Sequence, residues 1–466
     1  MADEHALNFF HGALLDEDAD VFLVQDGDYL IQAKPDRRFG PPKLILAIKK
    51  GSKVRRVDII KVDGAGYRFM GKTYPDLQQL INQFSTRPLE LTNGDTVLLK
   101  RAIPKGKFSF IHKDIRLQRK IGSGAYGTVY KGVMVKDSRP IAVKRIDSDG
   151  KNDQALIDMM KEARVMQLFD HPNIVKFYGY IVDRTPYLLV MELCSDGAVE
   201  DRLRSIGRGI PPAQRVQYSM HASRGLEYLH SKTCIHRDLA TRNCLLHGSV
   251  LKLADFGMCR ATTCYKIDLS KPQNVRWLAP EVWKTAETKF NTDVYAFAIT
   301  LWELFEIPYR TPYQEWPAYT VKERVMGGYR LQTPKEMPDA MIMIMKRCWD
   351  QDPERRPIAS EIRRQLEIIN QAYNDDDNLP TGRFDVVEKD PKSATLTARS
   401  RSVMTNPTSS TTTTPNNTTP KSPIAKTPTK DANNNPSVNI NSTAKSRKVD
   451  INNNAAAAKS DYGRPM

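Results

Sequence analysis

Apolar and polar residues in the first part of the chain follow a pattern typical of strands between two helices. Four such strands are predicted, at residues 28–33, 44–49, 54–61 and 67–70. Helical spacing flanks them, because Asp16 is placed to cap one helix and a second helix follows the last strand. The apolar faces of these helices consist of Ala19, Phe22 and Leu23 and of Leu77, Leu80, Ile81 and Phe84. We therefore predict a compact helix–strands–helix domain at residues 8–98.

A second pattern, from residue 114 to residue 370, begins with strands and becomes mostly helical. Apolar strands are predicted at 140–145 and 187–191, and apolar residues recur at helical spacing at 156–166, 290–306 and 359–369. Residues 85–113 contain one extended segment, 96–99, and we place the linker between the two domains at 99–113. Strands and helices grouped in this way indicate the α+β class.

The apolar periodicity ends near Tyr373, after which Ser, Thr, Asn, Pro and Lys dominate. Such a composition buries too little apolar surface to offset the entropy of an ordered chain, so residues 371–466 are predicted to form a disordered, low-complexity tail. Eleven basic and three acidic residues lie between 391 and 466, and this segment thus holds half of the net charge of +16. A basic tail fits nucleic acid, an anionic membrane surface or an acidic protein equally well.

The remaining composition favours a soluble protein of a reducing compartment. The six cysteines form no Cys-x-x-Cys pair, which argues against a disulfide framework and against a zinc site. The chain opens with no secretory signal, and its longest apolar run, 294–301, is far shorter than the roughly 20 residues of a membrane span. We expect a cytoplasmic location, with at most peripheral recruitment to a membrane.

Three polar residues at fixed spacing stand inside the second domain. Asp238 and Asn243 belong to the stretch Ile-His-Arg-Asp-Leu-Ala-Thr-Arg-Asn, and Asp255 opens Asp-Phe-Gly. One such residue would usually be a solvated surface group, but three at these spacings between apolar flanks are not. The set resembles the catalytic centre of protein kinases. This resemblance implies that Asp238 is the catalytic base, that Arg242 is the cation beside it, and that Asn243 and Asp255 bind Mg²⁺.

A nucleotide site is expected on the strands that precede this centre. Its glycine-rich turn, where backbone amides approach phosphates, comprises Ile121, Gly122, Ser123, Gly124, Ala125, Tyr126, Gly127, Thr128 and Val129. Lys144 on the next strand is expected to contact the phosphates of ATP while Glu162 orients it. The hinge for adenine should run from Glu192 to Cys194, and Cys194 is either a reactive thiol or an inert packing residue.

Residues 8–370 together resemble the C-terminal half of the Fes/Fer non-receptor tyrosine kinases. The likeness extends to Met258 after Asp-Phe-Gly, to the stretch 171–176 and to the stretch 346–350. It implies a two-lobed kinase fold and transfer of the ATP γ-phosphate to protein tyrosines in intracellular signalling. The membrane-curving and coiled-coil part of those kinases is absent from this sequence, so membrane targeting and oligomerisation are not carried over.

Acceptor specificity is predicted from the residues around the catalytic base. Serine/threonine kinases usually have Lys where Ala240 stands, whereas the cation at Arg242 is typical of tyrosine kinases. Arg276 and Trp277 also resemble the tyrosine-kinase pattern. These residues belong to the stretch 274–277, where the family docks its substrate. The family's proline in this docking stretch falls on Asn274, which predicts an unusual substrate preference.

The activation segment is expected to span residues 255–281. Tyr265 is its only tyrosine, and we predict that it is an autophosphorylation site whose phosphate pairs with Arg237. Glu281, at the end of the segment, is expected to pair with Arg356 as a structural tie.

The N-terminal domain resembles a Src homology 2 domain in its stretches 9–12 (Phe-Phe-His-Gly) and 27–32 (Gly-Asp-Tyr-Leu-Ile-Gln). The family's phosphate-gripping arginine falls on Gln32 and its helix-start arginine on Asp16. A neutral amide lacks the charged fork that grips a phosphate dianion, so binding of phosphotyrosine proteins should be weak or atypical. The degenerate pocket also includes Lys34 and Arg56. Basic substitutes at Lys34, Arg37, Arg38, Arg55 and Arg56 either compensate in part or are ordinary solvated charges.

Two other function classes fit the sequence less well than an active kinase does. A pseudokinase scaffold would need a broken catalytic residue, yet Lys144, Glu162, Asp238, Asn243 and Asp255 are all present. A nucleic-acid-binding protein would interleave its basic residues with aromatic ones, which the tail lacks, so no nucleic-acid partner is expected. The sequence thus favours a tyrosine kinase that uses ATP and Mg²⁺, with tyrosine-containing proteins as substrates.

Overall fold

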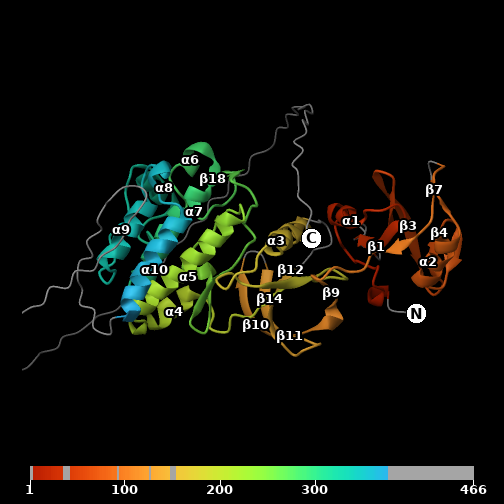
Figure 1. Cartoon of the computed structure of the whole chain (residues 1–466), viewed down its shortest axis with the longest axis horizontal. Coiled ribbons are helices and arrows are strands. Elements are labelled where there is room, and N and C mark those ends of the chain that lie inside the picture. The colour runs from red at the N-terminus through yellow and green to blue at the C-terminus, as the bar shows by residue number, and fades with distance from the viewer. Residues whose placement is uncertain (1–3, 35–41, 92–93, 125–126, 147–153, 376–466) are drawn as a thin grey trace, which may run out of the picture. The chain divides into compact units, whose positions relative to one another are not determined.

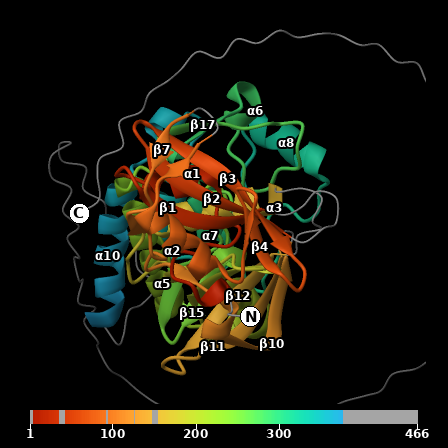
Figure 2. The same cartoon turned by 90° about the vertical axis from the view of Figure 1, so that its right-hand side faces the viewer.

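A computed structural model of the chain describes residues 4–34, 42–91, 94–124, 127–146 and 154–375 (Figure 1). The N-terminal domain is built on a sheet of order β5-β4-β3-β2-β1-β8. Its elements are η1 (Glu4–Ala6), α1 (Asp16–Phe22), β1 (Asp28–Lys34), β2 (Lys43–Lys50), β3 (Lys53–Val62), β4 (Gly66–Phe69), β5 (Lys72–Tyr74) and α2 (Leu77–Thr86). The four predicted strands and both predicted helices are thereby confirmed. Figure 2 looks toward this domain, with β1, β2 and β3 side by side.

Runs of buried residues along β1 and β2 build the core of this domain. Ile31, Leu46 and Ile59 pack with Leu80 of α2, and all four are buried. Asp76 caps α2, because its side chain accepts a hydrogen bond from the backbone N–H of Gln79 at 2.8 Å.

The predicted capping role of Asp16 is wrong. Leu15 occupies the N-cap position of α1, and Asp16 is the first residue of the helix. Its carboxylate accepts hydrogen bonds from Lys34 and Arg56 instead, since two cations bind a carboxylate more strongly than neutral backbone amides do.

The linker region is more structured than the single predicted extended segment. Its short strands are β6 (Leu89–Glu90), β7 (Thr96–Val97), β8 (Arg101–Ala102) and β9 (Ser109–Phe110), followed by η2 (His112–Asp114). β8 pairs in parallel with β1, and β9 pairs in parallel with β13 (Phe177–Ile181). The linker therefore adds one strand to each of the two large sheets, and short strands of this kind escape prediction because two residues carry no period.

The second domain opens with a sheet of order β10-β11-β12-β14-β13-β9. Besides β13 it contains β10 (Ile115–Gly124), β11 (Gly127–Met134), β12 (Pro140–Ile146) and β14 (Tyr187–Glu192), and it is joined by α3 (Gln154–Met166). Ile141, Val143, Leu188 and Val190 form a buried layer on it. Leu156, Met159, Met160, Ala163 and Met166 of α3 are buried, as their spacing predicts.

A mostly helical lobe follows. Its helices are α4 (Val199–Ile206), η3 (Gly207–Gly209), α5 (Pro212–Ser231), η4 (Thr241–Asn243), α6 (Val282–Thr285), α7 (Phe290–Phe305), α8 (Ala318–Met326), α9 (Asp339–Cys348), η5 (Pro353–Arg355) and α10 (Ala359–Asp375). Two hairpins, β15 (Cys244–His247) with β16 (Val250–Leu253) and β17 (Cys264–Lys266) with β18 (Glu287–Lys289), complete it. A sheet lobe followed by a helical lobe is the arrangement that the two-lobed prediction requires.

Helix α7 forms the centre of the helical lobe. It is buried continuously from Thr292 to Phe305, so its apolar run is a core helix. Helix α10 continues to Asp375, beyond the predicted domain end at residue 370. The rest of the predicted tail, 376–466, lies outside the described residues. No helix in the part of the chain that the structure describes is long and apolar enough to cross a membrane.

Candidate active site

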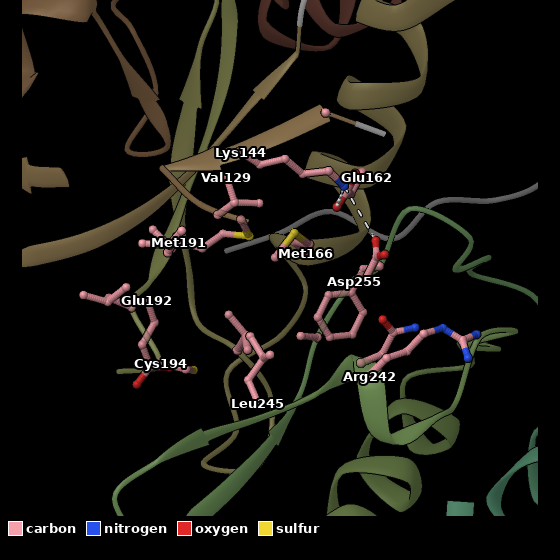
Figure 3. Close-up of a pocket in the computed structure, with 18 residues that line it drawn as sticks. Val129, Lys144, Glu162, Met166, Met191, Glu192, Cys194, Arg242, Leu245 and Asp255 are labelled. Carbon is pink, nitrogen blue, oxygen red and sulfur yellow. Dashed lines mark hydrogen bonds and ion pairs between the residues drawn. The ribbon is translucent and has the colours of Figure 1, made fainter. Parts of the chain in front are cut away.

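A cavity of about 240 Å³ lies where β10, β11 and β12 meet the hinge after β14 and the hairpin of β15 and β16 (Figure 3). Ten residues of the predicted ATP, catalytic and metal sets line it: Ile121, Gly127, Val129, Lys144, Glu162, Glu192, Cys194, Arg242, Asn243 and Asp255. Residues 122–124 and Thr128 belong to the same hairpin of β10 and β11. Ala125 and Tyr126, also predicted for this turn, lie outside the described residues.

Gly127 shows why the turn between β10 and β11 needs glycine. Its φ is +130°, and a Cβ at this position would come within 2.3 Å of the backbone oxygen of Arg145. Any other residue would collide with β12, so this glycine keeps the hairpin close to the strand that carries Lys144.

Lys144 on β12 is held by two carboxylates. Its Nζ lies 3.0 and 2.9 Å from Oε1 and Oε2 of Glu162 on α3, and 3.6 Å from Oδ1 of Asp255 (Figure 3). Burial by itself would lower the pKa of Lys144, but the two carboxylates outweigh burial and hold that pKa above its usual value. The lysine is therefore charged and fixed in place, and the predicted pairing with Glu162 is confirmed.

Asp238 receives hydrogen bonds on both oxygens of its carboxylate. Arg242 Nη2 lies 2.5 Å and Asn274 Nδ2 2.6 Å from Oδ1, while Asn243 Nδ2 lies 2.8 Å from Oδ2. Arg242 also lies over the ring of Trp277, 4.1 Å from its centre. The bond from Asn274 was not foreseen, because this residue is separated from Asp238 by 36 positions.

Two buried carboxylates that the sequence analysis missed fix the loop that carries Asp238. Asp293 on α7 accepts from the backbone N–H groups of His236 and Arg237, at 2.7 and 2.8 Å. Glu303, further along α7, accepts from Thr241 Oγ1 at 2.8 Å and from Trp277 Nε1 at 3.0 Å. Both carboxylates lie at the borders of an apolar run, and no motif spacing marks them. The loop that carries Asp238 is thereby bound to α7.

Met191 and Glu192 at the end of β14 and Cys194 in the hinge that follows line the cavity. Glu192 accepts a hydrogen bond from the backbone N–H of Lys176 at 3.1 Å and pairs with Lys252 at 3.1 Å. Burial raises the pKa of the Cys194 thiol to about 12, with the charge of Glu192 acting in the same direction. A thiol with this pKa is protonated at neutral pH, so the structure favours the packing alternative over the reactive one.

Tyr265 on β17 lies between two arginines. The guanidinium carbons of Arg237 and Arg260 are 4.7 and 4.9 Å from the centre of its ring. A hydrogen bond from Arg260 and the charges of both arginines lower the pKa of the tyrosine. At the end of the predicted activation segment, Glu281 and Arg356 form a two-pronged ion pair at 2.7 and 2.8 Å, which confirms the predicted tie.

The four residues predicted for the degenerate phosphotyrosine pocket come together in the N-terminal domain. Asp16 accepts from Lys34 Nζ at 2.6 Å, from Arg56 Nε at 3.0 Å and from Gln32 Nε2 at 3.2 Å. Burial by itself would raise the pKa of Asp16, but the hydrogen bond from Lys34 and the charge of Arg56 outweigh burial and lower it. Arg56 also pairs with Asp20. The two cations of this cluster, Lys34 and Arg56, thus bind two carboxylates of the same domain, Asp16 and Asp20. Arg37 and Arg38, which were also predicted as basic substitutes, lie outside the described residues.

Helix α1 also contacts helix α3, which carries Glu162. Arg164 on α3 donates to both carboxylate oxygens of Asp18, at 2.6 and 2.9 Å, and to Glu17 at 2.5 Å. The backbone N–H of Ala13 donates to the carbonyl of Val182 at 2.7 Å. The N-terminal domain therefore packs on the sheet lobe through α1 as well as through the linker.

Comparisons with known proteins agree with this geometry. Residues 115–366 match the family model of protein tyrosine and serine/threonine kinases. The human tyrosine-protein kinase Fer is 36% identical over 366 residues, covering 78% of this chain and 44% of that protein. The transforming tyrosine-protein kinase Fps of avian sarcoma virus (strain PRCII) is 31% identical, covering 78% of this chain and 68% of that protein. Fer-related kinase 1 of Caenorhabditis elegans is 26% identical, with 94% of its length covered. The chain spans less than half the length of the Fer proteins it matches.

Proposed function

The chain belongs to the protein tyrosine and serine/threonine kinase family, within its Fer/Fps type, and on this premise we propose that it transfers the γ-phosphate of ATP to tyrosine side chains of proteins. The observation that carries the proposal is the convergence of Lys144, Glu162, Asn243 and Asp255 on one cavity, next to the carboxylate of Asp238. A scaffold without activity would have no need of this complete set.

The residues that line the cavity fit ATP and Mg²⁺. Apolar side chains such as Val129, Ala142 and Leu245 offer faces to a flat base, and Lys144 supplies a fixed positive charge for phosphates. Asn243 directs its amide nitrogen at Asp238, which leaves its oxygen as the group that would bind a metal. With the carboxylate of Asp255 it forms an oxygen donor set of the kind that Mg²⁺ prefers. When bound, Mg²⁺ would neutralise charge on the phosphates.

In the proposed reaction the tyrosine oxygen forms a bond to the γ-phosphorus while the bond between that phosphorus and its bridging oxygen breaks. Asp238 accepts the proton of the tyrosine hydroxyl, and Arg242 holds the carboxylate in position. Lys144, fixed by Glu162, orients the phosphates, so positioning and electrostatics account for most of the acceleration.

A radiolabelled ATP assay on a tyrosine-containing polymer tests the proposal. Wild-type protein with Mg²⁺ should label the polymer, and the label should be phosphotyrosine. Asp238→Asn should lower the rate by about a hundredfold or more, because an amide cannot accept the proton. An equal rate in wild type and Asp238→Asn, or label confined to serine and threonine, would contradict the proposal.

We further propose that Tyr265 is an autophosphorylation site. Its phosphate would lie beside Arg237 and Arg260, which already flank the ring, and charge-assisted hydrogen bonds of this kind contribute about 1.5–3 kcal/mol each. That is enough for an effect of about tenfold on the population of an ordered activation segment.

Phosphopeptide mapping and Tyr265→Phe test this second role. Active enzyme should carry phosphate on Tyr265, and Tyr265→Phe should lower activity about tenfold after preincubation with ATP. Before preincubation the two proteins should be equally active. Unmodified Tyr265 in fully active enzyme would show that the segment is ordered without it.

For the N-terminal domain we propose a Src homology 2 fold whose phosphate site is neutralised by its own carboxylates. The carboxylate of Asp16 is hydrogen-bonded to Lys34 and Arg56, the two cations that a phosphate would otherwise bind. Gln32 adds no positive charge to the site. The domain would then act mainly through its contact with the sheet lobe. In this contact Asp18 and Glu17 bind Arg164, which lies two residues after Glu162 on α3.

A further inference from the structure

Asn274 occupies one of the positions where a hydroxyl group would meet the catalytic base. Each carboxylate oxygen has two in-plane lone pairs. On Asp238, Oδ1 already accepts from Arg242 at 2.5 Å and from Asn274 at 2.6 Å, and Oδ2 accepts from Asn243 at 2.8 Å. A single in-plane position on Oδ2 remains after these three bonds. An acceptor hydroxyl must use that position or replace one of the three donors.

Among these donors, Asn274 is the one that can leave. Arg242 lies over the ring of Trp277, and Asn243 donates a second bond to the backbone oxygen of Asp238 at 2.7 Å. Asn274 is exposed to solvent, and its side chain makes a single hydrogen bond among those described, the one to Asp238. Rotation of an exposed side chain requires no repacking, so this bond can be exchanged for another.

The backbone at Asn274 is nevertheless fixed. Its carbonyl accepts from the backbone N–H of Trp277 at 3.0 Å, and the Trp277 indole donates to the buried Glu303 at 3.0 Å. Arg276 donates to the carbonyls of Pro312 and Trp316, at 2.9 and 3.0 Å. The side chain of Asn274 is thus presented to Asp238 by a rigid loop, at the docking stretch where a substrate peptide would approach.

We propose that Asn274 is a displaceable cap on the catalytic base. This inference rests on the proposed kinase function and makes Asn274 a positioning residue that acts through Asp238. In the free enzyme the amide fills the position on Oδ1, which also denies that position to water. When a tyrosine peptide binds, the phenolic hydroxyl replaces the amide and donates to the same oxygen. The cap therefore lowers the affinity for the acceptor hydroxyl and suppresses ATP hydrolysis in its absence.

Binding of two matched peptides tests the cap without any chemical step. The full chain, with an unhydrolysable ATP analogue and Mg²⁺, is titrated calorimetrically with a tyrosine peptide and with the same peptide carrying phenylalanine. Asn274→Ala should bind the tyrosine peptide about three- to tenfold more tightly than wild type, because a hydrogen bond to a charged group no longer has to be broken. Its affinity for the phenylalanine peptide should not change.

Gln273→Ala is the matched control. Its side-chain amide donates to the carbonyls of Asp268 and Lys271, at 3.0 and 3.1 Å, and it lies next to Asn274 in the same loop. This variant should bind both peptides as wild type does. Equal changes for the tyrosine and phenylalanine peptides in Asn274→Ala would show a mere rearrangement of the loop, and weaker binding of the tyrosine peptide would show that the amide assists the hydroxyl. Either result overturns the inference.

ATP hydrolysis without peptide gives an independent readout. Asn274→Ala should release phosphate at least about threefold faster than wild type and Gln273→Ala, because the freed position on Asp238 orients water. An unchanged hydrolysis rate contradicts the cap. If the wild type binds both peptides but does not phosphorylate the tyrosine peptide, the proposed function fails, while the peptide affinities still decide whether Asn274 caps Asp238.

Discussion

Replacement of Lys144 by methionine is expected to lower the rate of phosphoryl transfer by about a hundred- to a thousandfold. The ammonium group is buried, lies within 3.0 Å of both oxygens of Glu162 and is 3.6 Å from Asp255. Methionine has a similar length and fills the same space, so packing is largely kept. What is lost is the fixed charge that positions the phosphates, and Glu162 is left buried with no cation beside it.

Steady-state assays with a tyrosine peptide measure this effect. The loss should appear mainly in kcat, because positioning and charge stabilisation act in the transition state. Lys136→Met is a suitable control, since Lys136 is exposed in the turn between β11 and β12. It should leave kcat unchanged. A Lys144→Met protein with undiminished turnover would refute the role of this lysine and, with it, the assignment of the cavity as the nucleotide site.

The second large effect is expected in the N-terminal domain. Wild-type protein should bind phosphotyrosine peptides about two to four decades more weakly than a variant that carries arginine at positions 16 and 32. Asp16 neutralises Lys34 and Arg56. Gln32 is buried, and its amide nitrogen donates to the backbone carbonyl of Leu14 and to the carboxylate of Asp16. A phosphate dianion would have to displace the carboxylate of Asp16 from its cations. Gln32→Arg alone should therefore recover only part of the affinity.

Titration of the full chain, in an Asp238→Asn background, with a phosphotyrosine peptide measures how much affinity each substitution recovers. Asp16→Arg, Gln32→Arg and the double variant are compared with Asp63→Arg, which adds positive charge at an exposed turn. Circular dichroism shows whether each variant remains folded. Tight binding by wild type that Gln32→Arg leaves unchanged would mean that other basic residues rebuild the pocket. A double variant that is folded yet binds no better than Asp63→Arg would mean that this cluster is not a phosphate site.

The chain's own pattern determined several of its elements and the centre of the candidate site. The strands from β1 to β4 and the helices α2, α3 and α7 coincide with apolar runs or apolar periods that the sequence displays directly. Asp238, Asn243 and Asp255 were identified because their residue types and spacing resemble the catalytic centre of protein kinases. The pair of Lys144 with Glu162, 18 positions apart, was expected from the same resemblance, with one residue on a predicted strand and the other on a predicted helix.

Other parts of the site were decided only by tertiary structure. Asp293 lies 56 positions from the backbone N–H of Arg237 that it binds, and Glu303 lies 62 positions from Thr241. The sequence does not mark either contact, because each forms only when α7 packs against the loop that carries Asp238. The pairing of Arg164 with Asp18, across 146 positions, depends in the same way on the packing of α1 against α3.

The sequence by itself determined which residue types stand at the catalytic and nucleotide positions, since local spacing and period are properties of the covalent chain. It also marked Asp16, Gln32 and Asn274 as departures from the family pattern. Only the tertiary structure decided what those departures do, because a carboxylate or an amide acts through the partner that folding brings to it. Asp16 neutralises two cations, and Asn274 donates to Asp238, through contacts between segments that are distant in sequence.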